Sequence, residues 1–262
     1  MFKRVEYKKP PLDEVVCQFR FPTILKINRD EPVEFQEKIR ENYPVYTKIG
    51  ESPINVNPAI SIAMNNQFQQ PAVSTIANHK FISEDGSWMI SLTQNFVTLS
   101  TMKYHNWPEF EEKIKYMIRI LNEVYSIPFY DRIGLRYRDV FIRSNYGVES
   151  KDWSDLITPP FLGLLYLNHA YKDAYNNACE LSFDCEVRAR VMTSIVIRNE
   201  NNSKSLTERE KCLMIDSDIS FDKRISKADA DSKLEEIHKV SSYILRSAIT
   251  DKMHELMGPQ YK

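Results

Sequence analysis

A stretch near the middle of the sequence, residues 131–143, constrains the fold more than any other part of the chain. Apolar and arginine side chains alternate along it, which is typical of a β-strand because successive side chains point to opposite faces. One face carries Ile133, Leu135 and Tyr137, and the other carries Arg132, Arg136 and Arg138. We therefore expect a half-buried strand whose three arginines either bind a ligand or pair with carboxylates of the same sheet.

The first half of the chain predicts more strands and a long helix around this stretch. Alternating apolar residues indicate strands, at residues 14–21, 59–64 and 74–102. The last of these ranges suits an antiparallel meander, because Asp85 and Gly86 form a typical hairpin turn. Asn106, Pro108 and Glu109 are typical of a helix start, with a capping box, and an apolar stripe then predicts a helix to residue 125.

The second half predicts strands followed by one long amphipathic helix. The strands are expected at residues 180–190, 192–198 and 211–221, and the helix at residues 227–257. At 1.5 Å per residue this helix is about 45 Å long, so it either backs the sheet or reaches a partner or a second copy. The expected fold class is α+β, with antiparallel sheets backed by long amphipathic helices.

The order of the expected elements suggests two related halves, residues 1–143 and 144–262. The first half combines strands, a short helix, a meander, a long helix and the arginine strand, and the second combines strands with the final helix. These halves fold either as two domains or as one merged unit, since the arginine strand is placed to pair with strands of both.

Composition and charge favour a globular protein and exclude several classes. Hydrophobic residues make up 42% of the chain and aromatic residues 11%, which allows a sizeable core. Lysine and arginine total 35 against 36 acidic residues, so the net charge does not indicate binding to nucleic acid or anionic lipid. The chain has neither an apolar run long enough for a membrane span nor the apolar segment of a signal peptide. We expect a cytoplasmic protein that does not bind a membrane.

No familiar catalytic or cofactor motif occurs in the sequence. The four cysteines include no C-x-x-C pair, and Cys17, Cys185 and Cys212 fall in strand-like runs, where a free cysteine is commonly a small buried hydrophobe. The five histidines show no HExxH spacing, and the six glycines form neither a P-loop nor a dinucleotide-binding motif. The sequence therefore predicts no cofactor.

The arginine face has two interpretations. A planar guanidinium binds phosphate or carboxylate in a bidentate manner, so the three arginines suit a phosphorylated ligand, and Tyr104 and Trp107 would add stacking for single-stranded nucleic acid. Neighbouring strands offer further cations, Arg20, Lys80 and Lys103. The other interpretation is a ladder of cross-strand ion pairs. The carboxylates available for such a ladder are Asp184, Glu186, Asp216 and Asp218.

Asp216 and Asp218 form a candidate metal site. In an alternating strand the two carboxylates share one face about 7 Å apart, close enough to hold a divalent ion. Together with Asp184 or Glu186 they would suit a metal-dependent nuclease or phosphotransferase. The simpler interpretation is an exposed strand face, because no accompanying histidine or lysine motif completes a metal site.

Three parts of the chain carry a resemblance that spans nearly its whole length. These are the proline pair and strand at residues 9–21, the segment 132–137, and the closing segments 215–218, 234–238 and 249–252. In these parts the chain resembles a sporadically distributed prokaryotic family of α+β proteins that has no assigned activity. The resemblance implies an α+β fold and a role in mobile or conflict-related systems such as antiviral defence.

Three functions remain open from the sequence. The favoured one is a non-catalytic binding or regulatory protein that acts through a protein partner or a homo-oligomer, because no catalytic motif is present. The second is a metal-dependent enzyme that acts on nucleic acid or a nucleotide through Asp216 and Asp218. The third is a sensor that binds a phosphorylated ligand through Arg132, Arg136 and Arg138. Whether the protein is an enzyme therefore stays open.

Overall fold

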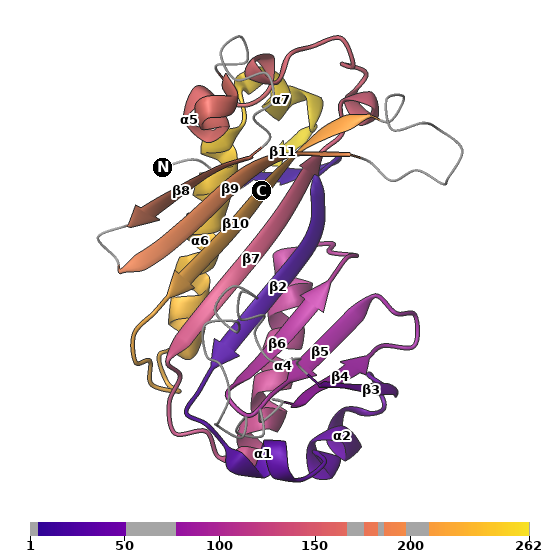
Figure 1. Cartoon of the computed structure of the whole chain (residues 1–262), viewed down its shortest axis with the longest axis vertical. Coiled ribbons are helices and arrows are strands. Elements are labelled where there is room, and N and C mark those ends of the chain that lie inside the picture. The colour runs from indigo at the N-terminus through magenta and orange to yellow at the C-terminus, as the bar shows by residue number, and fades with distance from the viewer. Residues whose placement is uncertain (1–4, 51–76, 167–175, 183–185, 198–209, 262) are drawn as a thin grey trace, which may run out of the picture.

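The computed structural model describes residues 5–50, 77–166, 176–182, 186–197 and 210–261. Nine strands of the described chain form one antiparallel sheet (Figure 1). In sheet order they are β3 (Val45–Gly50), β4 (Ala77–Ile82), β5 (Trp88–Leu92), β6 (Phe96–Thr101), β2 (Leu12–Arg20), β7 (Arg132–Phe141), β10 (Lys211–Phe221), β9 (Val187–Ile197) and β8 (Asn176–Ser182). The predicted α+β class is confirmed. The strand expected at residues 59–64 lies outside the described residues.

The arginine strand β7 lies at the centre of the sheet, between β2 and β10. It therefore pairs with a strand of each half, as the sequence predicts. The sheet is built in a similar way on both sides of its centre. On one side β2 pairs with β6, the last strand of the meander β3–β6, and on the other β7 pairs with β10, the last strand of β8–β10. The buried core is continuous across both halves. A division into separate domains stays a prediction.

The two long helices, α4 (Trp107–Tyr125) and α6 (Ala230–Ala248), lie against the same face of the sheet (Figure 1). The side chains of β2 and β7 that point to this face are buried, including Val15, Phe19, Ile133 and Leu135. Helix α6 packs on β7 and β10, so it backs the sheet. The shorter helices are α1 (Leu25–Arg29), α2 (Val33–Ile39), α5 (Pro159–Leu162) and α7 (Asp251–Leu256), with 3-10 turns at Arg143–Tyr146, Trp153–Asp155 and Gly163–Tyr166.

Local signals place the first long helix and the hairpin turn as predicted. The side chain of Asn106 accepts a hydrogen bond from the backbone N–H of Glu109 at 3.0 Å, which is the expected N-cap. The carboxylate of Glu109 contacts His105 at 2.9 Å instead of completing a capping box. Gly86 has a φ of 70°, the left-handed conformation that the turn between β4 and β5 requires.

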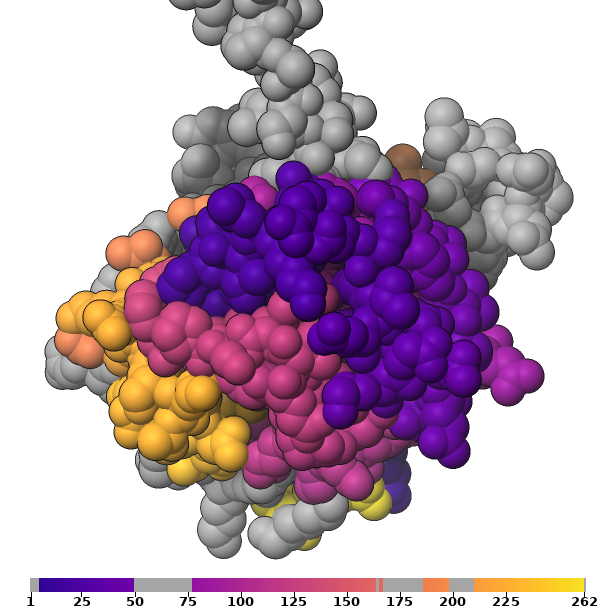
Figure 2. Space-filling view, turned by 90° about the horizontal axis from the view of Figure 1, so that it is seen from below, coloured from indigo at the N-terminus to yellow at the C-terminus, as the bar shows by residue number. Residues whose placement is uncertain are grey.

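Two contacts join distant parts of the chain at opposite ends of the sheet. A two-stranded sheet of β1 (Val5–Tyr7) and β11 (Pro259–Tyr261) holds together the two ends of the described chain. At the other end, Tyr130 forms a β-bridge with Ile225. Figure 2 shows this end, where N-terminal, central and C-terminal segments meet. Neither contact follows from local sequence patterns, because each depends on residues about 100 or more positions apart.

The prediction of one strand over residues 180–190 is wrong. Strand β8 ends at Ser182, and β9 begins at Val187 and continues to Ile197, so the chain reverses between them. Glu186 has a φ of 67°, which is unusual for a residue other than glycine. The alternation of apolar residues continues in phase through the reversal, and no glycine, proline or asparagine marks it. Period-two patterning therefore could not reveal this turn.

The prediction of one helix over residues 227–257 is also wrong. Helix α6 ends at Ala248, and α7 starts at Asp251. Between them Ile249 forms a β-bridge with Ile157, and the side chain of Thr250 caps α7 by accepting from the N–H of Met253. The apolar spacing continues across the break, so the tertiary contact with Ile157 decides where α6 ends.

Candidate functional site

The candidate site lies on the face of the sheet opposite α4 and α6, which we call the open face; no helix of the described residues covers it (Figure 1). The strand register defines rows of side chains across it. One row is polar apart from a glycine: Thr47, Lys80, Ser91, Thr98, Gln18, Gly134, Ser220 and Arg188. The next row changes character along its length: Val45, Ile82, Met89, Ser100, Val16, Arg136, Asp218 and Arg190. This second row is uncharged towards β3 and charged towards β9, whereas the first row carries Lys80 near β3 and Arg188 at β9.

Among the open-face ion pairs of the described residues, the pair of Arg136 and Asp216 has the most buried carboxylate. Arg136 Nε donates to Asp216 Oδ1 at 2.7 Å and its Nη2 donates to Oδ2 at 2.5 Å, a bidentate arrangement. The side chain of Asp216 is only 8% exposed, whereas that of Arg136 is 47% exposed. Because the hydrogen bonds to Asp216 favour the charged guanidinium, the pKa of Arg136 is raised. A buried carboxylate without this partner would be strongly destabilising.

Arg138 is held by two carboxylates because β2 contains a bulge. The register between β2 and β7 shifts between Leu12 and Glu14, so Asp13 and Glu14 both lie beside Arg138. Arg138 donates to Asp13 Oδ2 at 2.5 and 2.8 Å and contacts Glu14 Oε2 at 3.1 Å. Neither carboxylate was among the partners expected from the sequence. The bulge is the reason, because strict alternation assigns only one of them to this face.

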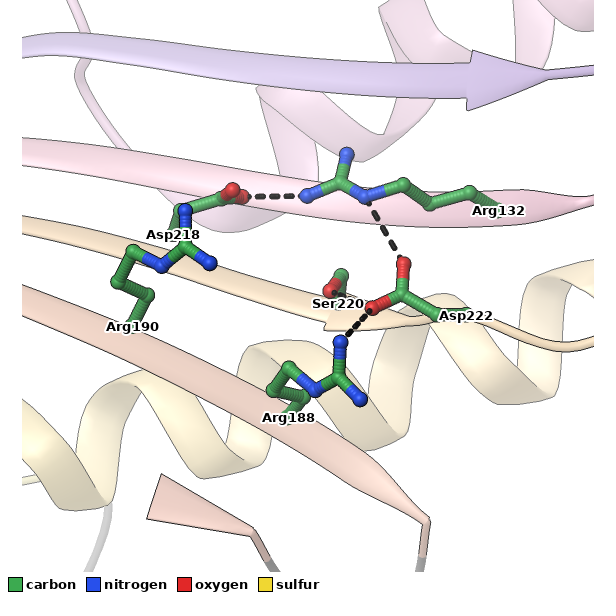
Figure 3. Close-up of a pocket in the computed structure, with 6 residues that line it drawn as sticks. All are labelled: Arg132, Arg188, Arg190, Asp218, Ser220 and Asp222. Carbon is green, nitrogen blue, oxygen red and sulfur yellow. Dashed lines mark hydrogen bonds and ion pairs between the residues drawn. The ribbon is translucent and has the colours of Figure 1, made fainter. Parts of the chain in front are cut away.

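Arg132 crosses the sheet and joins three strands. Its guanidinium donates to Gln18 on β2 at 3.0 Å and to Asp218 on β10 at 2.6 Å, and its Nε lies 3.0 Å from Asp222 (Figure 3). This path runs over Gly134: a Cβ on that residue would lie 2.3 Å from Arg132 Nη1. Gly134 is therefore required for close approach and not for an unusual backbone conformation.

A hollow of ≈ 160 Å³ lies at the β9 side of this network. Its lining consists of Arg132, Arg188, Arg190, Asp218, Ser220 and Asp222 (Figure 3). Asp222 accepts from Ser220 at 3.0 Å and lies 3.5 Å from Arg188. The lining carries three guanidinium groups and two carboxylates, and guanidinium groups are the donors that a small anion would use.

The structure brings the predicted arginines and two of the predicted carboxylates together as a cross-strand ladder. Arg132 pairs with Asp218 and Arg136 with Asp216. Glu186 does not join the ladder, since it pairs with Lys223, and Asp184 lies outside the described residues. The interpretation as a ladder is therefore correct for Asp216 and Asp218 and wrong for Glu186, which sits in the β8–β9 turn.

The metal hypothesis for Asp216 and Asp218 stays a prediction. The two residues do share the open face, as alternation predicts, but each is bonded to an arginine. A cation at Asp216 would have to displace the bidentate guanidinium of Arg136. Among the described residues, no group of three or more histidine, cysteine, aspartate or glutamate side chains is placed to hold a metal ion.

Other residues singled out from the sequence belong to the core. Trp107 is buried and stacks on His238 with ring centroids 3.8 Å apart, and Tyr104 packs against Phe110, so neither is available for stacking on the open face. Cys17 and Cys212 are buried free cysteines, as predicted, and Cys185 lies outside the described residues.

Arg20 and Lys80 do lie on the open face, whereas Lys103 pairs with Asp85.

Sequence patterns missed one buried acid, Asp139. It lies on β7 on the same side as Leu135 and Phe141, between Leu12 and Ile215, and it is 4% exposed. Its Oδ1 accepts no hydrogen bond from any of the described residues. Burial, with a smaller contribution from the negative charge of Asp216, raises the pKa of Asp139 to about 7. Its odd-numbered position in the strand, shared with the apolar residues, is the signal that could have identified it.

The sequence matches no model of a known protein family, and a search of curated protein sequences returned no match.

Within the described part of the chain, none of the helices is both long enough and apolar enough to cross a membrane.

We predict that the Arg136–Asp216 pair couples more strongly than the exposed Arg138–Asp13 pair. In a double-mutant cycle with alanine at both positions, the Arg136–Asp216 coupling free energy should be about 2 kcal/mol, because Arg136→Ala leaves a buried charge alone. The matched cycle of Arg138 and Asp13 should give about 0.5 kcal/mol. Urea unfolding of the variants measures both. Equal couplings would show that burial of Asp216 does not matter.

We predict that Asp139 makes the protein less stable as the pH rises. The folded-state pKa is raised, so the folded protein binds the proton more tightly than the unfolded chain. The contribution of Asp139 to the free energy of unfolding is therefore largest below the ordinary aspartate pKa, falls as the pH rises towards 7, and stays low above it. A shift of this size corresponds to about 4 kcal/mol.

The variant Asp139→Asn tests this pH dependence. Its free energy of unfolding should match that of the parent protein at pH 4 and exceed it by about 2–4 kcal/mol at pH 8.5. Denaturant titrations of both proteins at both pH values give the difference in their free energies of unfolding. Groups other than residue 139 titrate in both proteins, so their effects cancel in this difference. A difference that does not change between pH 4 and 8.5 would contradict the assignment.

Proposed function

We propose that the protein is a non-catalytic binding protein that docks a protein partner on the open face of its sheet. The observation that carries the proposal is the fixed ladder on this face. Arg132, Arg136 and Arg138 each bond to carboxylates of neighbouring strands, so they form a rigid platform and are not free to act on a substrate. Rigid elements lower the entropic cost of binding a partner.

The composition of the open face also supports a protein partner. A row of apolar side chains continues into a row of charged ones, and a combination of apolar contacts with arginine is typical of protein interfaces. Whole-chain charge gives no support for nucleic acid. A role in prokaryotic defence belongs to the same proposal, and its support is the family resemblance of the sequence. A cytoplasmic location belongs to it as well, and its support is the composition and patterning of the sequence.

A second candidate is a sensor of a phosphorylated ligand, favoured by the hollow at β9. Arg188 and Arg190 lie two residues apart on β9 and contribute to it with Arg132 (Figure 3). A phosphate group would accept charge-assisted hydrogen bonds from guanidinium groups there. Asp218 and Asp222 oppose an anion at the same place, so this candidate ranks second.

We predict that charge reversal on the open face abolishes partner binding. The tagged protein is purified from its own cells, and the protein that co-purifies with it is identified and purified. The Kd of the complex between the two proteins is then measured for the parent protein and for the variant Arg20→Glu/Arg190→Glu. The Kd should rise at least tenfold. The control Lys227→Glu/Lys252→Glu changes exposed lysines away from the open face and should leave the Kd unchanged.

Two results would overturn the proposal. Equal binding by the open-face and control variants would remove the open face from the interaction. Thermal stabilisation of the parent protein by inorganic phosphate or nucleotides, lost in Arg188→Ala, would favour the phosphate sensor instead.

A further inference from the structure

The half of the open face formed by β3, β4, β5, β6 and β2, which we call the first-half face, differs from the ladder. Its open-face apolar side chains are Val16, Val45, Ile49, Ile82, Met89 and Phe96. Val45 is 46% exposed and Ile49 is 47% exposed, which is high for side chains of this type in a folded protein. Contiguous apolar patches on a surface often mark a binding site, and Val45 lies in one row with Ile82 and Met89.

Two cations lie within this apolar surface. Among the described residues the side chains of Arg20 and Lys80 form no ion pair and no side-chain hydrogen bond, in contrast to the ladder arginines. Lys80 is in register with Ser91, which is in register with Thr98 and then Gln18, two residues from Arg20. The two cations are therefore roughly 14 Å apart across the strands and about 7 Å apart along them.

Among the described residues, no acidic side chain of the first-half face is left without a basic partner. In its strands the carboxylates on this side are Asp13 and Glu14, and both are bonded to Arg138. A second copy of the chain docking through the same surface would bring Arg20 and Lys80 against like charges. Two free cations also make a poor match for a nucleic-acid backbone, which needs many phosphate contacts.

We propose that the first-half face binds an acidic protein surface, in which apolar side chains contact Val45, Ile82 and Met89 and flanking carboxylates pair with Lys80 and Arg20. This inference rests on the proposed function and adds to it the half of the face and the chemistry of the partner. The ladder half supports the sheet, because its charges are satisfied within the chain.

The test places a photo-crosslinking amino acid at Met89 in one variant and at Met192 in another. Met192 lies on the open face in the ladder half, in register with Asp216, and is the matched control. Crosslinking is done in the protein's own cells, and the crosslinked peptides are identified by mass spectrometry. We expect products from Met89, at partner peptides with aspartate or glutamate nearby, and at least tenfold less from Met192.

A paired set of charge variants checks the same inference without the crosslinker. Lys80→Glu/Arg20→Glu should raise the Kd of the co-purifying protein at least tenfold, whereas Arg188→Glu/Arg190→Glu should change it less than threefold. Circular dichroism and thermal unfolding confirm that each variant is folded.

The outcomes separate this inference from the proposed function. Crosslinks from Met192 alone, with loss of binding only in the β9 variant, would overturn the inference and keep the open face as the site. Crosslinks to a second copy, to nucleic acid or to a basic partner peptide would overturn the inference. Absence of crosslinks from both positions, with binding retained by both charge variants, would overturn the proposed function as well.

Discussion

The pairing of β7 with β2 on one side and β10 on the other is the constraint on which the rest of the structure depends. It joins the two halves into one sheet, and its register decides which carboxylate faces each arginine. Because side chains alternate, the same register turns Ile133 and Leu135 towards α6 and the three arginines towards the open face. A slip of one residue would bury the arginines and expose the core.

The arginine network also fixes the strands relative to one another. Arg132 reaches across Gly134 to contact both neighbours of β7, and Arg136 neutralises a carboxylate that is almost fully buried. An ion pair of this kind adds little net stability by itself, but breaking it is costly. The network therefore favours one register over its alternatives, and the open face that results is rigid and half apolar.

Sequence patterns predicted the parts of the fold that depend on local signals. The arginine strand, the helix after Asn106 and the turn at Gly86 follow from alternation, capping and glycine chemistry. Errors arose where a tertiary contact overrides a continuous pattern: alternation hid the turn after Ser182, and apolar spacing hid the break after Ala248.

For the candidate site, alternation identified the arginines and Asp216 and Asp218 but could not assign partners. Pairing depends on register, and the bulge at Asp13 and the path over Gly134 depend on three-dimensional contacts. Buried Asp139 was not predicted because aspartate is typical of exposed positions, although its place in the alternation puts it with the core-facing residues of β7. The free cations Arg20 and Lys80 were visible in the sequence, but their difference from the ladder arginines appears only once the partners are known.

The most direct test of the β7 network is the free energy of unfolding of Gly134→Ala with and without Arg132. With Arg132 present, the new methyl group displaces the guanidinium, and the protein should lose about 1–2 kcal/mol. In the Arg132→Ala background the same change should stabilise the protein by about 0.5 kcal/mol, because alanine reduces the entropy of the unfolded chain. An equal effect of Gly134→Ala in both backgrounds would contradict the account.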